Sequence, residues 1–301
     1  MTTTDLLPRL QAAGLIDGTD SRVTPLKGGV SSQIGLGCVT LGREIDEAAS
    51  YVLLDHALAR GVRLFDTAAA YGQGASESIL GRWLASRRPS GISIATKILP
   101  PYDRIDISAS MQRLGVDQID LLYLHQWHDS VFAAGPALDE LVASSKVKAL
   151  GLSNVTLEQL QAAGPRFSVV QNNHNLAVSD VSDALREYCV AHGIAIVTYS
   201  PLGAGFLTGK HQQGVQSGSR FDLVPGHQDV YFNSDSYRRL ATLEAVAERT
   251  GHSQAHLALA WALHQPGIDS VLVGGRTPAH LDQAFAALDL SDPSLFAELT
   301  S

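Results

Sequence analysis

Apolar and polar positions along the chain form two alternating kinds of segment. Eight short segments are apolar and rich in β-branched residues, which is typical of buried strands. They are IGLG (34–37), VRLFD (62–66), ISIATK (92–97), DLLYLH (120–125), KALGLSN (148–154), SVVQNN (168–173), IAIVTYS (194–200) and SVLVG (270–274). Longer amphipathic segments separate them, so we predict alternating strands and helices.

The helix-like segments carry start and end signals. Asp46 opens DEAASYVLLDHALARG as an N-cap, and Gly61 lies just past the end of that helix. TLEQLQAAG offers a capping box formed by Thr156 and Gln159. DALREYCVAHG closes on Gly193, and AHLALAWALHQPG ends before a proline.

This alternation predicts an α/β protein whose parallel sheet closes into a single-domain (β/α)8 TIM barrel over residues 23–301. An open doubly wound sheet is the alternative, but GLGCVTLG (35–42) matches the dinucleotide-binding GxGxxG pattern only in part. GGVSS (28–32) is expected to turn an N-terminal hairpin, and residues 1–22 to form a separate, helical extension.

Chemically active side chains gather at the ends of the predicted strands. The residues at or just past those ends are Asp66, Lys97, His125, Asn154, Gln171, Tyr199 and Gly274. In a barrel, these ends converge on the face where active sites are built. We therefore expect a catalytic site on that face.

Asp66, Tyr71, Lys97 and His125 come from three consecutive strands and one following loop, so their side chains can meet. A lysine ammonium beside a tyrosine favours the phenolate and is expected to lower the phenol's pKa. Asp66 can balance the lysine's charge, and His125 can hydrogen-bond a substrate oxygen. Such a group protonates an oxygen while the attached carbon is attacked.

These residues stand in motifs that resemble those of the aldo-keto reductases. DTAAAYG (66–72), ATK (95–97) and LYLH (122–125) resemble the family's aspartate–tyrosine, lysine and histidine elements. GLSN (151–154), VVQNN (169–173) and YSPLGAGFLTGK (199–210) resemble its cofactor-binding segments. The resemblance runs in order from about residue 23 to the end of the chain.

The resemblance implies an NADP(H)-dependent oxidoreductase in which Tyr71 is the general acid, tuned by Lys97 and Asp66, while His125 positions the carbonyl. GGRTPAHLDQAF (274–285) resembles the family's adenosine-phosphate segment, where an arginine can bind a 2′-phosphate. His280 and Gln283 stand where the family often has Gln and Glu. The implied cofactor-binding residues are Ser153, Asn154, Gln171, Tyr199, Ser200, Leu202, Gly203, Lys210, Gly274, Arg276, Thr277, His280 and Gln283.

The substrate is expected to be a small-molecule carbonyl or alcohol, sugar-like or aromatic, held by loops on the same face. The candidate substrate-binding residues are Cys38, Tyr102, Trp127, His128, Tyr231 and Phe232. Cys38 is equally plausible as core packing. The long segment 204–233 is expected to be a lid or binding loop, with Arg220 and Phe221 folding over the cofactor.

Other chemistries stay open at this point. His125, His128 and Asp129 suggest a metal cluster, although further ligands with metal-site spacing are lacking, so no metal is expected. Lys97 could form a Schiff base, as in barrel aldolases. A cofactor-binding regulatory protein of the same fold is a third alternative.

Composition narrows the class of partner. The 301 residues are 45% apolar, enough for a sizeable core, and the net charge of −8 argues against nucleic acid or an anionic membrane. The two cysteines are far apart, the start of the chain lacks a secretory signal, and no apolar run approaches about 20 residues. We expect a cytoplasmic protein; its oligomeric state is left open.

Overall fold

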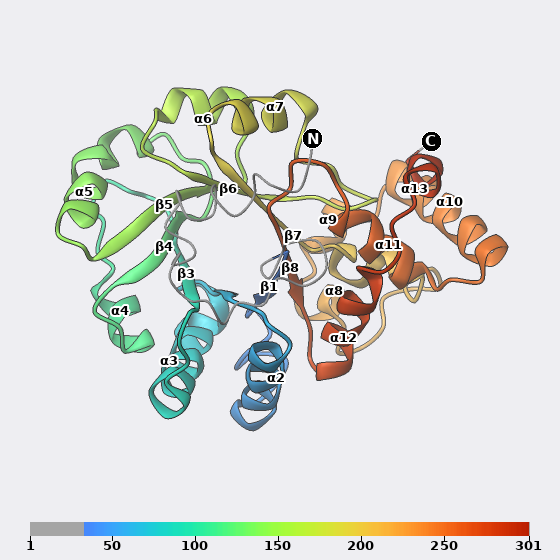
Figure 1. The fold of residues 1–301 in the computed structure, drawn as a ribbon, viewed down its shortest axis with the longest axis horizontal. Helices are drawn as coiled ribbons and strands as arrows, with labels where there is room; N and C mark the ends of the chain where they lie inside the picture. Colours follow the sequence, from blue (N-terminus) through green and yellow to red (C-terminus); the bar gives the residue numbers. More distant parts are fainter. Residues whose placement is uncertain (1–32, 301) are drawn as a thin grey trace.

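The fold is a closed barrel of eight parallel strands in chain order, seen in a computed structural model that describes residues 33–300 (Figure 1). The strands are β1 (Ile34–Gly37), β2 (Leu64–Asp66), β3 (Ser93–Ile98), β4 (Ile119–Leu124), β5 (Val147–Ser153), β6 (Val169–Asn173), β7 (Ala195–Tyr199) and β8 (Ser270–Gly274). β8 pairs with β1, which closes the sheet and excludes the open doubly wound alternative.

Helices surround the barrel, most of them following a strand (Figure 1). The helical elements are α2 (Glu47–Ala59), η2 (Tyr71–Gly74), α3 (Ala75–Arg87), α4 (Ser108–Leu114), α5 (Val131–Ala143), α6 (Leu157–Ala163), α7 (Asp183–Ala191), η3 (Gly203–Thr208), α8 (Arg220–Leu223), α9 (His227–Tyr231), α10 (Ser234–Thr250), α11 (Gln254–Leu263), α12 (Pro278–Ala287) and α13 (Pro293–Leu299). None of these helices is both long enough and apolar enough to cross a membrane.

The helix boundaries follow the capping signals of the sequence. Asp46 accepts a hydrogen bond from the Ala49 amide at the start of α2, as predicted. Thr156 and Gln159 form the reciprocal capping box at the start of α6. These local signals therefore fix where α2 and α6 begin.

Apolar side chains fill three regions of the molecule. Two clusters lie between the strands and the surrounding helices, one including Trp83 and Leu257 and the other Leu122 and Leu160. A third cluster fills the barrel interior. Its buried members are Leu64, Ala95, Leu121, Tyr123, Ala149, Val169, Ala195, Val197 and Leu272. The barrel is therefore packed, and only its ends are open to a ligand.

The segment between β7 and α10 contains the short helices η3, α8 and α9, where the sequence suggested one long loop. Two arginine contacts attach it to other loops of the barrel face. Arg220 forms an ion pair with Glu44 after β1 (3.1 Å), and Arg276 after β8 donates to the Gly218 carbonyl (3.1 Å). The predicted extension (1–22) and hairpin turn (28–32) lie outside the described residues.

Candidate active site

The four residues predicted to act together converge at one end of the barrel. Asp66 ends β2, Lys97 lies in β3, His125 follows β4, and Tyr71 begins η2. The Lys97 ammonium donates to the Asp66 carboxylate, to the Thr67 carbonyl (2.8 Å) and to the Tyr71 hydroxyl (3.4 Å). One ammonium group therefore touches both the anion and the phenol.

A tight turn presents Tyr71 to this centre. The backbone at Gly72 and Gly74 is left-handed, with φ of 56° and 90°, a conformation that glycine adopts without strain. Behind the turn, Thr67 and Ser76 share a hydrogen bond of 2.8 Å, and Ser76 donates to the Cys38 carbonyl (2.7 Å). These bonds hold the turn against β1 and β2.

The Asp66–Lys97 pair is almost completely shielded from solvent, with side chains 3% and 1% exposed. Burial acts to lower the pKa of Lys97, but the charge of Asp66 and the contact with Tyr71 reverse this and raise it. The lysine is therefore held as an ammonium. A Schiff base requires a neutral amine, so this environment opposes the aldolase alternative.

The pKa of Tyr71 differs from the sequence-based expectation. Burial raises it above the ordinary tyrosine value, and the Lys97 charge lowers it only in part, so the net shift is upward. The expectation that Lys97 makes this phenol more acidic than a free tyrosine is therefore wrong for the free protein. Tyr71 is fully protonated at neutral pH, which is the state that a proton donor needs.

His125 faces Tyr71, with the two rings in an edge-on arrangement and 5.8 Å between centroids. Burial and the nearby Lys97 charge lower the pKa of His125 to about 4, so the imidazole is neutral at pH 7. Its Nδ1 atom is buried and has no hydrogen-bond partner among residues 33–300. Within that range, no group of three metal-binding side chains surrounds His125 or any other position.

A polar clamp lies beside the four residues, at the ends of β5, β6 and β7. The Asn154 amide donates to the His125 carbonyl (3.0 Å) and accepts from the Tyr199 hydroxyl (2.6 Å). Gln171 donates from Nε2 to the second Asp66 oxygen (2.9 Å). Ser153 is buried next to Asn154. These amides and hydroxyls fit the carboxamide of a nicotinamide, which needs both donors and acceptors.

Cationic side chains gather at the other end of the same face. Burial lowers the pKa of His280, and the charges of Arg276 and Lys210 lower it further. Burial also lowers the pKa of Lys210, and the charge of Arg276 lowers it further. The His280 ring accepts from the Arg276 amide (3.2 Å) and lies 3.2 Å from the Thr277 hydroxyl. A bound anion would offset the repulsion that Arg276 exerts on Lys210 and on protonation of His280, so this cluster fits a cofactor phosphate. Gln283 is exposed on the same helix, and Gly274 ends β8.

The turn after β7 is held by two asparagines that the sequence analysis did not single out. The Asn175 amide donates to Asn173 (3.0 Å) and to the Ser200 carbonyl (2.9 Å), and Asn173 donates to the Tyr231 hydroxyl (3.0 Å). Ser200 has a φ of 56°, and Leu202 and Gly203 follow it into η3. The polar run QNNHN in an otherwise apolar strand was the available signal.

The candidate substrate-binding residues divide into two groups. Trp127 and Phe232 are half-buried, and His128 is exposed. Cys38, Tyr102 and Tyr231 are 0%, 1% and 3% exposed, so the structure places them within the packing and not on the surface of the site. The burial of Cys38 agrees with the alternative that this residue belongs to the core packing. Tyr102, in a loop, donates to the Gln126 carbonyl (2.7 Å), and Tyr231, at the end of α9, donates to Asn173 (3.2 Å), so both rings turn inward.

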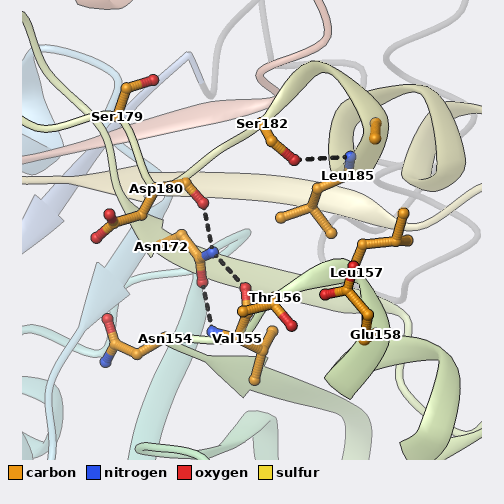
Figure 2. A pocket seen from close by; sticks show the side chains of 11 residues that line it. Asn154, Val155, Thr156, Leu157, Glu158, Asn172, Ser179, Asp180, Ser182 and Leu185 are labelled. Carbon is orange, nitrogen blue, oxygen red and sulfur yellow. Dashed lines mark hydrogen bonds between the residues drawn. The ribbon is translucent and has the colours of Figure 1, made fainter.

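A cavity of about 340 Å³ lies next to the clamp, between the loops that lead into α6 and α7 (Figure 2). Asn172 joins the two loops: it accepts from the Val155 amide (3.1 Å) and donates to the Asp180 carbonyl (2.9 Å), as Figure 2 shows. Asn154 lines both this cavity and the clamp. The cavity thus adjoins the site, but the four converging residues do not line it.

The sequence of this chain matches one protein family. A sequence profile described as the aldo/keto reductase family matches residues 33–295. A probable aldo-keto reductase 1 from Glycine max is 32% identical, covering 90% of this chain and 86% of that protein. Aldo-keto reductase YhdN from Bacillus subtilis (strain 168) is 30% identical, covering 84% and 83%. The fold matches a glycerol dehydrogenase from Gluconobacter oxydans, with TM-score 0.73, 24% identity, and coverage of 96% and 94%.

Proposed function

The chain belongs to the aldo/keto reductase family, and from this premise we propose that it is an NADP(H)-dependent oxidoreductase that interconverts an aldehyde or ketone with its alcohol. Family membership makes the protein an oxidoreductase acting on carbonyl substrates. The family uses nicotinamide cofactors. We further propose that the protein prefers the phosphorylated cofactor and that individual residues have the roles described below.

One observation carries the proposal: the buried Lys97 ammonium contacts both the Asp66 carboxylate and the Tyr71 hydroxyl. A phenol that gives up its proton becomes an anion, and an ammonium held beside it stabilises that anion without reorganising. Asp66 keeps the ammonium charged in a site where burial disfavours charge. The three residues together suit proton donation to a substrate oxygen.

In the direction of reduction, Tyr71 donates its proton to the carbonyl oxygen as the carbonyl group is converted to an alcohol. Lys97 stabilises the phenolate that remains. His125 is neutral, and a ring N–H of this imidazole donates a hydrogen bond that orients the same oxygen. A bound nicotinamide would supply the hydride for the carbonyl carbon. In oxidation, Tyr71 accepts the proton instead.

The residues around this centre would hold the cofactor. Ser153, Asn154 and Gln171 would bind the carboxamide, and the Tyr199 ring would lie under the nicotinamide. Ser200, Leu202 and Gly203 would line the pyrophosphate, at the turn that Asn175 holds. For the 2′-phosphate, we assign the cluster after β8 together with Lys210. Its members are Gly274, Arg276, Thr277, His280 and Gln283.

The test is turnover by the purified protein with NADPH and a panel of aldehydes and ketones, followed through loss of reduced-nicotinamide absorbance. We expect turnover of at least one carbonyl and tighter binding of NADPH than of NADH, measured by quenching of tryptophan fluorescence. Tight NADPH binding without any turnover would favour a regulatory protein instead. An imine trapped on Lys97 by borohydride would point to an aldolase.

A further inference from the structure

Tyr123 is a second phenol, buried in the barrel interior in register with Lys97. It lies in β4, and its side chain points into the barrel interior with 0% exposure. The strand register pairs Tyr123 with Lys97 on one side and with Gly151 on the other. The Lys97 Nζ atom lies 5.8 Å from the Tyr123 ring centroid and 4.9 Å from that of Tyr71. The ammonium is therefore near two phenol rings.

The barrel leaves space for this ring only because residue 151 is glycine. A Cβ atom at Gly151 would lie 2.4 Å from two carbon atoms of the Tyr123 ring, closer than real contacts allow. The ring is therefore closely fitted and has no room to turn away. A phenylalanine at position 123 would occupy the same volume.

The hydroxyl of Tyr123 is the feature that packing does not explain. It is buried and completes no hydrogen bond of normal geometry with any residue that the structure describes. A buried hydroxyl without a partner destabilises a fold, and such groups are rare in native proteins. Phenylalanine would avoid that penalty, so the hydroxyl calls for a role outside the free state.

Two polar neighbours indicate what that role is. Burial raises the pKa of Tyr123 well above its ordinary value and the Asp66 charge raises it further, while an interaction with the Gln171 side chain, too poor in geometry to complete a hydrogen bond in the free protein, lowers it. Gln171 donates to the second oxygen of Asp66 (2.9 Å), and the proposed function also requires Gln171 to bind the cofactor carboxamide. If its amide turns to the carboxamide, that oxygen of Asp66 loses its donor.

We propose that Tyr123 is a positioning residue, whose hydroxyl donates to Asp66 in place of Gln171 when Gln171 binds the cofactor. The replacement keeps the carboxylate fully hydrogen-bonded, and with it the Lys97 ammonium and the Tyr71 hydroxyl in place. The inference rests on the proposed function. According to this proposal, one exchange of hydrogen bonds at Asp66 both allows Gln171 to bind the cofactor and keeps Tyr71 in position to donate its proton.

Tyr123→Phe tests this inference because it removes only the hydroxyl. We expect an unchanged or higher Tm without cofactor, since an unpartnered polar group is lost. The Kd for the nicotinamide cofactor, measured by tryptophan-fluorescence quenching with NADPH and with NADH, should rise about 10-fold, because a hydrogen bond to a charged group is lost only in the bound state. The kcat should fall by a similar factor. Tyr188→Phe, at a half-buried phenol on α7 stacked against His192, is the matched control.

A double-mutant cycle with Gln171→Ala isolates the exchange. Without Gln171, the Tyr123 hydroxyl has to serve Asp66 in both states, so adding Tyr123→Phe should change Kd by less than about 2-fold. An equal Kd and kcat for Tyr123→Phe and the parent would overturn the inference, as would a full effect in the Gln171→Ala background. A parent that binds cofactor but reduces no carbonyl would overturn the proposed function alone, because the Kd cycle is read without turnover.

Discussion

The Lys97 Nζ atom lies 3.4 Å from the Tyr71 hydroxyl, while the same ammonium is bound to the Asp66 carboxylate. The contact joins Lys97 in β3 to Tyr71 at the start of η2, the turn that follows β2. Burial raises the pKa of Tyr71 and the Lys97 charge lowers it only in part, so the free phenol stays protonated while the ammonium remains in contact with its hydroxyl. Under the proposed function, Lys97 acts in the transition state of proton transfer, where the phenolate forms.

Removing the hydroxyl of Tyr71 should separate chemistry from binding. Tyr71→Phe keeps the ring that faces His125 but has no proton to donate, so kcat for carbonyl reduction should fall by about 10²–10⁴. The Kd for NADPH should change by less than about 3-fold, because that hydroxyl is assigned no cofactor contact. Steady-state kinetics and fluorescence titration measure the two quantities.

Tyr237→Phe provides the control for that experiment, since this phenol is 39% exposed on α10. Its kinetics should match those of the parent. If Tyr71→Phe reduces carbonyls at the parent's rate, Tyr71 is not the proton donor and the role assigned to Lys97 fails with it.

Cofactor preference should depend on Arg276. Arg276→Ala removes a fork of donors from the cationic cluster, so the NADPH Kd should rise about 10-fold or more while the NADH Kd changes by less than about 2-fold. Arg276 also donates to the Gly218 carbonyl, so a merely structural effect would weaken both cofactors equally. Arg276→Lys keeps the charge without the fork and should fall between the two. Raising the salt concentration should reduce the difference between NADPH and NADH.

Much of the barrel was predictable because its signals are local. Each strand is a short apolar run, the side chains of Asp46 and Thr156 cap α2 and α6 through amides three positions on, and polar side chains stand at the strand ends. The strand predictions are confirmed with shifts of at most two residues; the largest is at β2, which begins at Leu64, because Val62 is still bonded to the Ala57 carbonyl at the end of α2.

What the sequence could not predict depends on packing between distant segments. Tyr102 lies in a loop and Tyr231 ends the short helix α9, so no period of two fixes the direction of either side chain. The net pKa of Tyr71 depends on how deeply it is buried, a quantity that the motif does not contain. The inward direction of Tyr123 could have been predicted from the sequence, since it alternates with Leu121 and His125. Only the register with Gly151 shows that its ring fits inside the barrel.

The stability of the protein should fall in mild acid because two histidines are buried in the neutral form. Burial lowers the pKa values of His125 and His174 to about 4 each. The unfolded chain takes up protons first as the pH falls below about 6.5, so the free energy of unfolding decreases from there toward pH 4 and is flat above about pH 7. Each histidine contributes at most about 1.4 kcal/mol per pH unit.

His174→Phe tests this linkage at a position away from the catalytic centre. The His174 ring packs against Trp261, with 5.2 Å between centroids, and its Nε2 has no partner among the described residues. Urea unfolding between about pH 4.5 and 7 should show a slope reduced by up to one proton in the variant. An unchanged slope would mean that His174 does not titrate in the unfolding transition.

Removing Asp66 together with Lys97 should restore stability but not activity. Lys97→Met leaves the Asp66 carboxylate buried without its counter-charge, so unfolding should become easier by about 3–5 kcal/mol. Adding Asp66→Asn removes that stranded charge and keeps a donor and acceptor for Gln171, so the double variant should recover much of the lost stability. It should not recover turnover, because neither residue can then stabilise a phenolate at Tyr71. Urea unfolding and kcat measured on the same preparations separate the two effects, and a double variant as active as the parent would show that the ammonium has no part in proton donation.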